Sequence, residues 1–294
     1  MYQIAQNDQS GKQINSMLEI NPDAIFTAEA LDDERKLKGA RGPLHGIPVV
    51  LKDNIETKDS MHTSAGTIAL ENHLASKDAF LVKKLREADA ILLGKANMTE
   101  LANGMSSTMW AGYSARGGQT LNPYGDPTLF VGGSSSGSAV AVASNFTVLS
   151  VGTETDGSIL SPAIQNSVVG IKPTVGLISR DGLIPFTYSQ DTPGPFARTV
   201  KDAAILLSVL TGKDENDIST YKNEGSTQQD YMSYLDREGL KGAKIGVFNN
   251  GSKEYYQCGE YDEQLFTNAI QILIDQGATI IENIEIPSFH REWK

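Results

Sequence analysis

A stretch with almost no charged residues, from position 127 to position 179, constrains the fold of this chain more than any other feature. Charge occurs there only at Glu154, Asp156 and Lys172, whereas glycine, serine, alanine and valine dominate. A solvated surface is rarely so poor in charge. Glycine and serine at this density let backbone segments pack closely and point N–H groups at a ligand. We therefore expect this stretch to contain both core and functional site.

Helical and strand-like segments alternate along the chain, which indicates an α/β fold with a largely parallel or mixed sheet. Residues 211–232 are polar and acidic, and we expect them to form an exposed excursion or a weak linker. The patterns predict helices over 22–38, 78–89, 139–145 and 262–276, and strands over 46–51, 90–93, 146–151, 244–248 and 278–286.

The charge balance and the N-terminal sequence exclude several classes of protein. A net charge of −11 argues against binding to nucleic acid or to an anionic membrane, which requires clustered lysine and arginine. The apolar runs are too short to span a bilayer, and the first residues lack the layout of a signal peptide. Cys258 is the single cysteine and can form no internal disulfide, which fits a reducing compartment. These features predict a cytoplasmic protein.

Two loops rich in serine and glycine, residues 132–138 and 152–159, are the candidates for chemistry. Both fall at the ends of predicted regular elements, where catalytic residues are commonly positioned. A nucleophilic serine needs a base and an oxyanion site. Histidine is the usual base, and the four histidines lie far from these loops in sequence, which does not exclude them. Lys52 closes an apolar strand, where burial would lower its pKa enough for it to serve as base instead.

Five blocks in this order resemble the amidase signature family: GPLHGIPVVLKDN, GGSSSGSAVAVASN, GTETDGSILSPA, GIKPTVGLISRDGLIPF and SQDTPGPFARTVKDAA. Several separate blocks in the family's order are far more specific than any one glycine-rich loop. The resemblance implies a single domain over residues 1–294, built on a mixed β-sheet flanked by helices. It also implies a hydrolase that cleaves the C–N bond of an amide with a Ser–cis-Ser–Lys catalytic unit and without a cofactor or metal.

The resemblance assigns a role to each matching position. Ser158 is the nucleophile, and Ser134 is the serine that follows a cis peptide bond. Lys52 is the base: it takes a proton from Ser134, which in turn takes one from Ser158. Ser135 and Asp191 are expected to support the site rather than to react. The oxyanion would be stabilised by the backbone N–H groups of Thr155, Asp156, Gly157 and Ser158.

Two departures from the family pattern bear on the substrate. Asp156 stands where the family more often has glycine, and Leu160 stands where it more often has an arginine that could pair with a substrate carboxylate. An acidic substrate is therefore disfavoured, and the ammonia-supplying subunit of tRNA-dependent amidotransferases is a poor match. We expect hydrolysis of a neutral amide, with the C-terminal amides of peptides as the leading candidates.

Two alternative interpretations remain open from the sequence. Gly133–Gly137 also reads G-x-S-x-G, which would make Ser135 the nucleophile of an α/β-hydrolase esterase with His290 downstream. Family members also extend further at both ends, so the chain is expected to lack the C-terminal part of the fold. In that case it would be a catalytically incompetent fragment or an interaction protein, with self-association through an exposed sheet edge.

Overall fold

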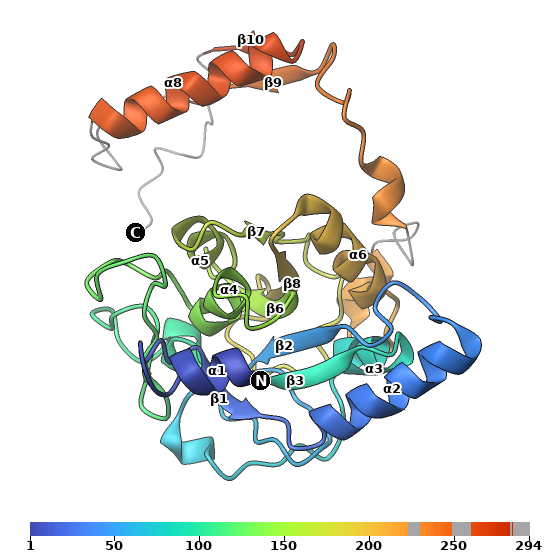
Figure 1. The fold of residues 1–294 in the computed structure, drawn as a ribbon. Coiled ribbons are helices and arrows are strands. Elements are labelled where there is room, and N and C mark those ends of the chain that lie inside the picture. The colour runs from blue at the N-terminus through green and yellow to red at the C-terminus, as the bar shows by residue number, and fades with distance from the viewer. Residues whose placement is uncertain (223–229, 249–259, 283, 285–294) are drawn as a thin grey trace. The chain divides into compact units, whose positions relative to one another are not determined.

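The computed structural model describes residues 1–222, 230–248, 260–282 and 284, which form two compact units divided between Met232 and Ser233. The larger unit contains a six-stranded sheet in the order β1-β3-β2-β6-β8-β7, with helices packed on it (Figure 1). Parallel and antiparallel neighbours both occur in this sheet. The predicted α/β fold with a mixed sheet flanked by helices is therefore confirmed.

The strand directions bring the segments that follow β2 and β6 to the same end of the sheet. Strand β2 is parallel to β3 and to β6, so the C-terminal ends of β2 and β6 lie at the same end of the sheet. Lys52 is the last residue of β2, and Glu154 is the last residue of β6. The strands of the sheet are β1 (Met17–Ile20), β2 (Pro48–Lys52), β3 (Ile91–Ala96), β6 (Leu149–Glu154), β7 (Val169–Gly170) and β8 (Thr192–Ala197), and β4 (Tyr113–Ser114) pairs separately with β5 (Gly118–Gln119).

Apolar side chains along β2 alternate between two of the three apolar clusters that the described residues form. Val49 and Leu51 belong to the cluster that contains side chains of α3 and α6, whereas Val50 belongs to the cluster that contains Val140 of α4. Because successive side chains of a strand point to opposite faces, Lys52 lies on the same face as Val50 and α4. The helices of this unit are α1 (Tyr2–Asn7), α2 (Ala24–Lys38), α3 (Phe80–Glu87), α4 (Ser136–Ala143), α5 (Leu160–Gln165) and α6 (Val200–Leu210), with short 3₁₀ helices at Ile68–Leu70, Glu100–Asn103 and Ile218–Lys222. A further 3₁₀ helix, Tyr231–Tyr234, spans the division between the two units.

Helix α4 packs unusually close to neighbouring backbone because it is built from small residues. A Cβ atom at Gly137 would lie 2.3 Å from the carbonyl oxygen of Ser16 and 2.4 Å from that of Asn97. Glycine at this position therefore permits the hydrogen bond from Gly137 N to Asn97 O, at 3.0 Å. This close packing fixes the start of α4, and with it the serines that precede the helix.

The predicted strand over residues 146–151 is wrong by three residues, because β6 covers Leu149–Glu154 instead. Asn145 adopts a φ of 59°, and the N–H groups of the next two residues bond back to Ala141, so the chain is still turning there. The strand then continues through Glu154, which pairs with Thr192 of β8. Tertiary pairing, which local sequence does not reveal, thus draws part of the predicted loop into the sheet.

The prediction of an exposed excursion over residues 211–232 is only partly right for the first half of this segment, because buried residues are interspersed with exposed ones over residues 211–222. Asp214, Asp217 and Thr220 are buried, because their polar groups find partners inside the protein. The guanidinium of Arg180 forms an ion pair with Asp217 and holds the pKa of that carboxyl well below its usual range. Residues 223–229 lie outside the described part of the chain.

The smaller unit contains the predicted strand–helix–strand arrangement. Its parallel strands are β9 (Lys244–Gly246) and β10 (Thr279–Ile281), and the helix between them in sequence is α8 (Glu260–Asp275). The end of the predicted strand over 278–286 lies largely outside the described residues. Among the helices that the structure describes in either unit, none has the length and apolar character needed to cross a membrane.

Candidate active site

The amine of Lys52 lies at the centre of a buried polar cluster at the end of β2. Its Nζ is 2.8 Å from Ser134 Oγ and 2.9 Å from Ser135 Oγ. It also lies 3.0 Å from the carbonyl oxygen of Thr153 and 2.9 Å from Thr153 Oγ1. An ammonium group has three protons for these four oxygens, whereas a neutral amine can donate to the carbonyl and accept from a hydroxyl. The arrangement therefore suits a neutral lysine that receives a proton from Ser134.

Burial changes the acid–base properties of this amine. The Lys52 side chain is fully inaccessible to solvent. Loss of hydration lowers the pKa of Lys52 to about 7, although the carboxylates of Asp191 and Glu154 oppose the shift. The neutral amine is therefore accessible near neutral pH, as a general base requires. The expectation that burial at the end of an apolar strand would depress this pKa is confirmed.

The two loops predicted to carry the chemistry are joined by backbone contacts. The peptide bond between Gly133 and Ser134 is cis, as the family resemblance implies. Ser135 N donates a hydrogen bond of 3.2 Å to the carbonyl oxygen of Ser158. Ser135 Oγ also donates to Thr153 O at 2.9 Å, and a Cβ at Gly152 would lie 2.7 Å from this hydroxyl. Glycine at 152 is therefore required for the two loops to meet.

A cavity of about 360 Å³ opens beside these loops and is bordered by both Ser134 and Ser158. The two serines share its wall, and among the described residues no hydrogen bond joins their hydroxyls. Residues 155–158 border the same cavity, and their backbone N–H groups bond to no described residue. They remain available to an oxyanion. The lining residues are Thr99, Ala102, Asn103, Ala111, Phe130, Gly133, Ser134, Thr155, Asp156, Gly157, Ser158, Ser161 and Phe186.

Two buried carboxylates brace the loop that contains Ser158. Glu154 accepts hydrogen bonds from Ile159 N at 2.6 Å and from Leu160 N at 2.9 Å, so its buried carboxylate connects the beginning of the loop to its end. Asp191 accepts from the hydroxyl of Thr155 and from the backbone N–H of Phe186, at 2.8 Å for the latter. The predicted supporting role of Asp191 is thus consistent with its contacts, whereas that of Glu154 was not foreseen.

Glu154→Gln should change the pH dependence of the reaction. Glutamine keeps an oxygen that accepts from the N–H groups of residues 159 and 160, but it removes a negative charge that raises the pKa of Lys52. We expect the acidic limb of the kcat/KM profile to move toward lower pH, as measured with a neutral amide. Glu154→Ala is the comparison, because it removes both the negative charge and the two hydrogen bonds to residues 159 and 160. This variant should also have a lower kcat. If the acidic limb of Glu154→Gln stays at the pH of the unmodified chain, Glu154 has no direct electrostatic effect on the pKa of Lys52.

The alternative nucleophile, Ser135, is placed differently. Its hydroxyl is buried, is engaged with Lys52 and Thr153, and is not among the described groups that border the cavity. The described residues just before Ser135 form no strand, whereas the nucleophile elbow of α/β-hydrolases requires one. His290, the proposed partner, lies outside the described residues. The geometry therefore favours Ser158.

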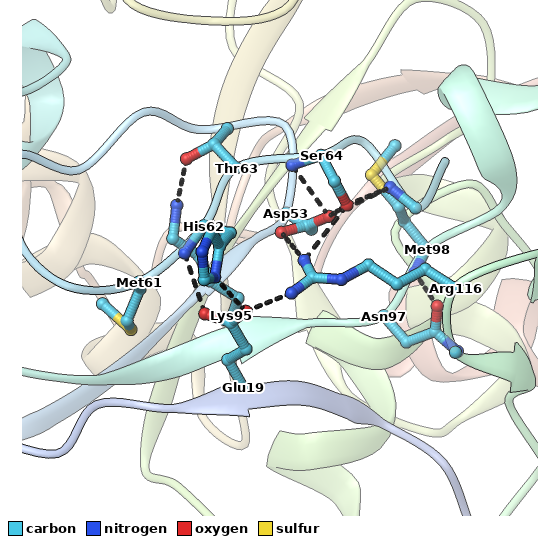
Figure 2. Close-up of polar contacts among 12 residues, drawn as sticks. Glu19, Asp53, Met61, His62, Thr63, Ser64, Lys95, Asn97, Met98 and Arg116 are labelled. Atoms are coloured by element: carbon cyan, nitrogen blue, oxygen red, sulfur yellow. Dashed lines mark hydrogen bonds and ion pairs between the residues drawn. The ribbon is translucent and has the colours of Figure 1, made fainter. Parts of the chain in front are cut away.

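A second buried lysine, Lys95 of β3, lies on the opposite face of the sheet. Its register partner in β2 is Leu51, whose side chain faces α3 and α6. The pairing of β2 with β3 shifts in register between Val49 and Val50, before this pair. Lys95 donates to Ile55 O and to Thr63 Oγ1, and burial lowers its pKa to about 8. Figure 2 shows it within a larger polar cluster that includes Asp53, the residue after Lys52.

This cluster fixes the segment that follows β2. Asp53 accepts from the hydroxyl of Ser64 and from Gly66 N at 3.0 Å, and burial raises the pKa of its carboxyl. Arg116 lies 3.5 Å from Asp53 and also forms an ion pair with Glu19 (Figure 2). The cluster thus anchors the chain directly after Lys52, which helps to hold the amine in one position.

Several groups at the site were not predicted from the sequence. Thr153 and Glu154 belong to the quoted block GTETDGSI, so proximity to Ser158 was the available signal. Phe130 and Phe186 border the cavity but come from distant segments, and nothing in the local sequence marks them. Leu160, in contrast, is exposed and is not among the described residues that line the cavity.

Comparison with known proteins connects this geometry to one family. A family model described as amidase matches residues 2–294. A putative amidase of Schizosaccharomyces pombe is 47% identical over 274 residues, which are 92% of this chain and 46% of that protein. A glutamyl-tRNA(Gln) amidotransferase chain of Alkaliphilus metalliredigens is 40% identical over 279 residues, which are 94% of this chain and 54% of that one.

Solved structures agree with the sequence relatives. The peptide amidase of Stenotrophomonas maltophilia is 45% identical and superposes with a TM-score of 0.90, over 98% of this chain and 57% of that enzyme. The chain thus spans about half the length of the relatives it matches. A match over nearly every residue, to the family's sequence model and to a solved structure alike, leads to one conclusion: this chain belongs to the amidase family.

Proposed function

We propose that the chain hydrolyses the C–N bond of a primary amide through an acyl-enzyme on Ser158. The observation that carries this proposal is the buried Lys52 amine, which lies 2.8 Å from Ser134 Oγ at a cavity that Ser158 also borders. Similarity to a peptide amidase supports the C-terminal amide of a peptide as the substrate class. The reaction needs neither metal nor cofactor, because the nucleophile, the base and the oxyanion donors all come from the chain.

Proton transfer would run through the two serines. Neutral Lys52 accepts the proton of Ser134, and Ser134 accepts the proton of Ser158 as the latter attacks the amide carbonyl. The C–O bond to Ser158 forms while the carbonyl π electrons move to oxygen, where the N–H groups of residues 155–158 can stabilise the negative charge. The C–N bond then breaks, and the relay returns the proton to the departing nitrogen as ammonia.

Hydrolysis of the acyl-enzyme uses the same groups. Water attacks the ester carbonyl and gives up a proton through Ser134 to Lys52, and Ser158 leaves with that proton restored. Ser135 and Thr153 would keep the amine in place, because both contact Nζ directly. Glu154 and Asp191 would keep the loop around Ser158 in its observed shape.

Release of ammonia from a panel of amides tests the proposal. The panel comprises aliphatic, aromatic and peptidyl primary amides, assayed at pH 8, where most Lys52 amines are neutral. We expect peptidyl amides to give the highest kcat/KM, with a free carboxylate as the second product. Failure of every amide to release ammonia, together with no labelling of Ser158 by a fluorophosphonate, would refute the proposal.

Three broader predictions accompany this function. We infer that both units belong to one amidase domain, since the family match is continuous over residues 2–294. The acidic composition and the single cysteine support a cytoplasmic location. Self-association through a sheet edge stays a prediction, and size-exclusion mass measures it.

A further inference from the structure

Asp156 borders the proposed active-site cavity. Asp156 lies between Thr155 and Gly157 in the loop that precedes Ser158, and it is exposed. Its carboxylate forms no hydrogen bond or ion pair with any residue that the structure describes. Among the described lining residues it is also the one with a formal charge. A carboxylate without a partner among these residues is free to bind a cationic group of a ligand.

The surroundings of the cavity strengthen this negative potential. Glu154 and Asp191 are both buried beneath the same loop, and their charges add to that of Asp156. Lys52, which contacts Ser134 at the cavity wall, is fully buried, and burial lowers its pKa to about 7. The net charge of −11 would also attract cations from a distance.

The apolar part of the wall suits the same kind of ligand. Phe130 and Phe186 border the cavity, and Trp110 packs edge-on against Phe130 with their ring centroids 5.9 Å apart. Aromatic faces attract cations and also accept the methylene groups of a long side chain. The volume of about 360 Å³ accommodates a side chain of this size.

We propose that Asp156 makes this site selective for amides whose acyl portion bears a positive charge, such as a basic side chain, over neutral or anionic amides of the same shape. This inference rests on the proposed function, because it takes the cavity beside Ser158 as the substrate site. The charge must belong to the acyl portion, since ammonia is the leaving group of a primary amide. The backbone N–H of Asp156 keeps its separate role as an oxyanion donor.

Binding to the full chain with Ser158→Ala tests charge selection without catalysis. The ligands are N-acetyl-lysinamide and N-acetyl-norleucinamide, which present similar alkyl side chains and differ in the terminal ammonium, and calorimetry measures both at low salt. We expect the cationic ligand to bind about five-fold more tightly. Salt at 0.5 M should reduce this ratio, because exposed ion pairs are screened. The double variant Ser158→Ala/Asp156→Asn should bind the two ligands equally.

Two further variants separate the effect of the Asp156 carboxylate from the effect of the overall charge of the chain. Asp32→Asn removes one negative charge from the exposed surface of α2 and should leave the ratio unchanged. Asp156→Glu, which restores the carboxylate, should preserve the preference. Equal binding of the two ligands, no binding of the cationic one, or a preference that survives Asp156→Asn would each overturn the inference.

The outcome for catalysis is distinguishable from the outcome for selectivity. Charge-selective binding without hydrolysis by the unmodified chain would refute the proposed function and leave the role of Asp156 intact. Hydrolysis of both amides with equal kcat/KM, and equal binding, would refute the role of Asp156 and leave the proposed function intact.

Discussion

Ser158→Ala is expected to abolish amide hydrolysis, with kcat/KM falling by about 10⁴-fold or more. The hydroxyl of Ser158 supplies the bond to the acyl group, and no neighbouring group can replace it, because Ser134 and Ser135 are both engaged with Lys52. Ammonia release measures the loss, and labelling by a fluorophosphonate should disappear with it. An unchanged circular dichroism spectrum would show that the fold is preserved.

Ser135→Ala provides the matched comparison, because it removes a hydroxyl from the neighbouring loop. This hydroxyl contacts Lys52 and Thr153, so we expect a reduced rate. Activity should nevertheless remain at least about 100-fold above that of Ser158→Ala, since the nucleophile is intact. The reverse order, with Ser135→Ala inactive and Ser158→Ala active, would make Ser135 the nucleophile and refute the mechanism.

Lys52→Met is expected to lower kcat/KM by about 10³-fold, the usual contribution of a general base. In the unmodified chain the rate should fall tenfold per pH unit below about pH 7, because protonated Lys52 cannot accept the proton of Ser134. Above that pH the neutral amine predominates, and the rate should level off. In Lys52→Met this limb should vanish, as a pH profile of kcat/KM measured from pH 5 to 9 would reveal.

Lys95→Met is the control for burial of a lysine. Lys95 is also fully buried and has a lowered pKa, but it lies on the other face of the sheet and contacts Ile55 and Thr63. Its replacement should lower the free energy of unfolding while leaving the acidic limb in place. A limb that disappears in Lys95→Met but persists in Lys52→Met would show that Lys95, and not Lys52, is the base.

The position of Lys52 could be predicted because it depends on a local pattern. An apolar run followed by lysine indicates a buried strand with the amine at its end, and β2 ends at Lys52 as expected. The contact with Thr153 could not be predicted in the same way, because it requires β2 and β6 to be neighbours and parallel. The site could thus be located from the sequence, but its partners depend on tertiary pairing.

Strand β8 illustrates why part of the fold escaped prediction. Its sequence, TPGPFA, contains Pro193 and Pro195, although proline is normally excluded from the middle of a sheet. The carbonyl of Pro195 accepts from Ile171 N, so the prolines face the side where the partner strand β7 has two residues. The missing N–H groups therefore cost few hydrogen bonds, while the side that pairs with β6 stays intact.

The pairing of β6 with β8 has a consequence for biosynthesis. Lys52, Ser134 and Ser158 all leave the ribosome before β8 does, since β8 ends at Ala197. Until β8 pairs with β6, the end of β6 lacks its partner strand, so Thr153, which contacts the Lys52 amine, is not yet held in place. The nascent chain would therefore gain a reactive serine only after translation had passed the last strand of its sheet.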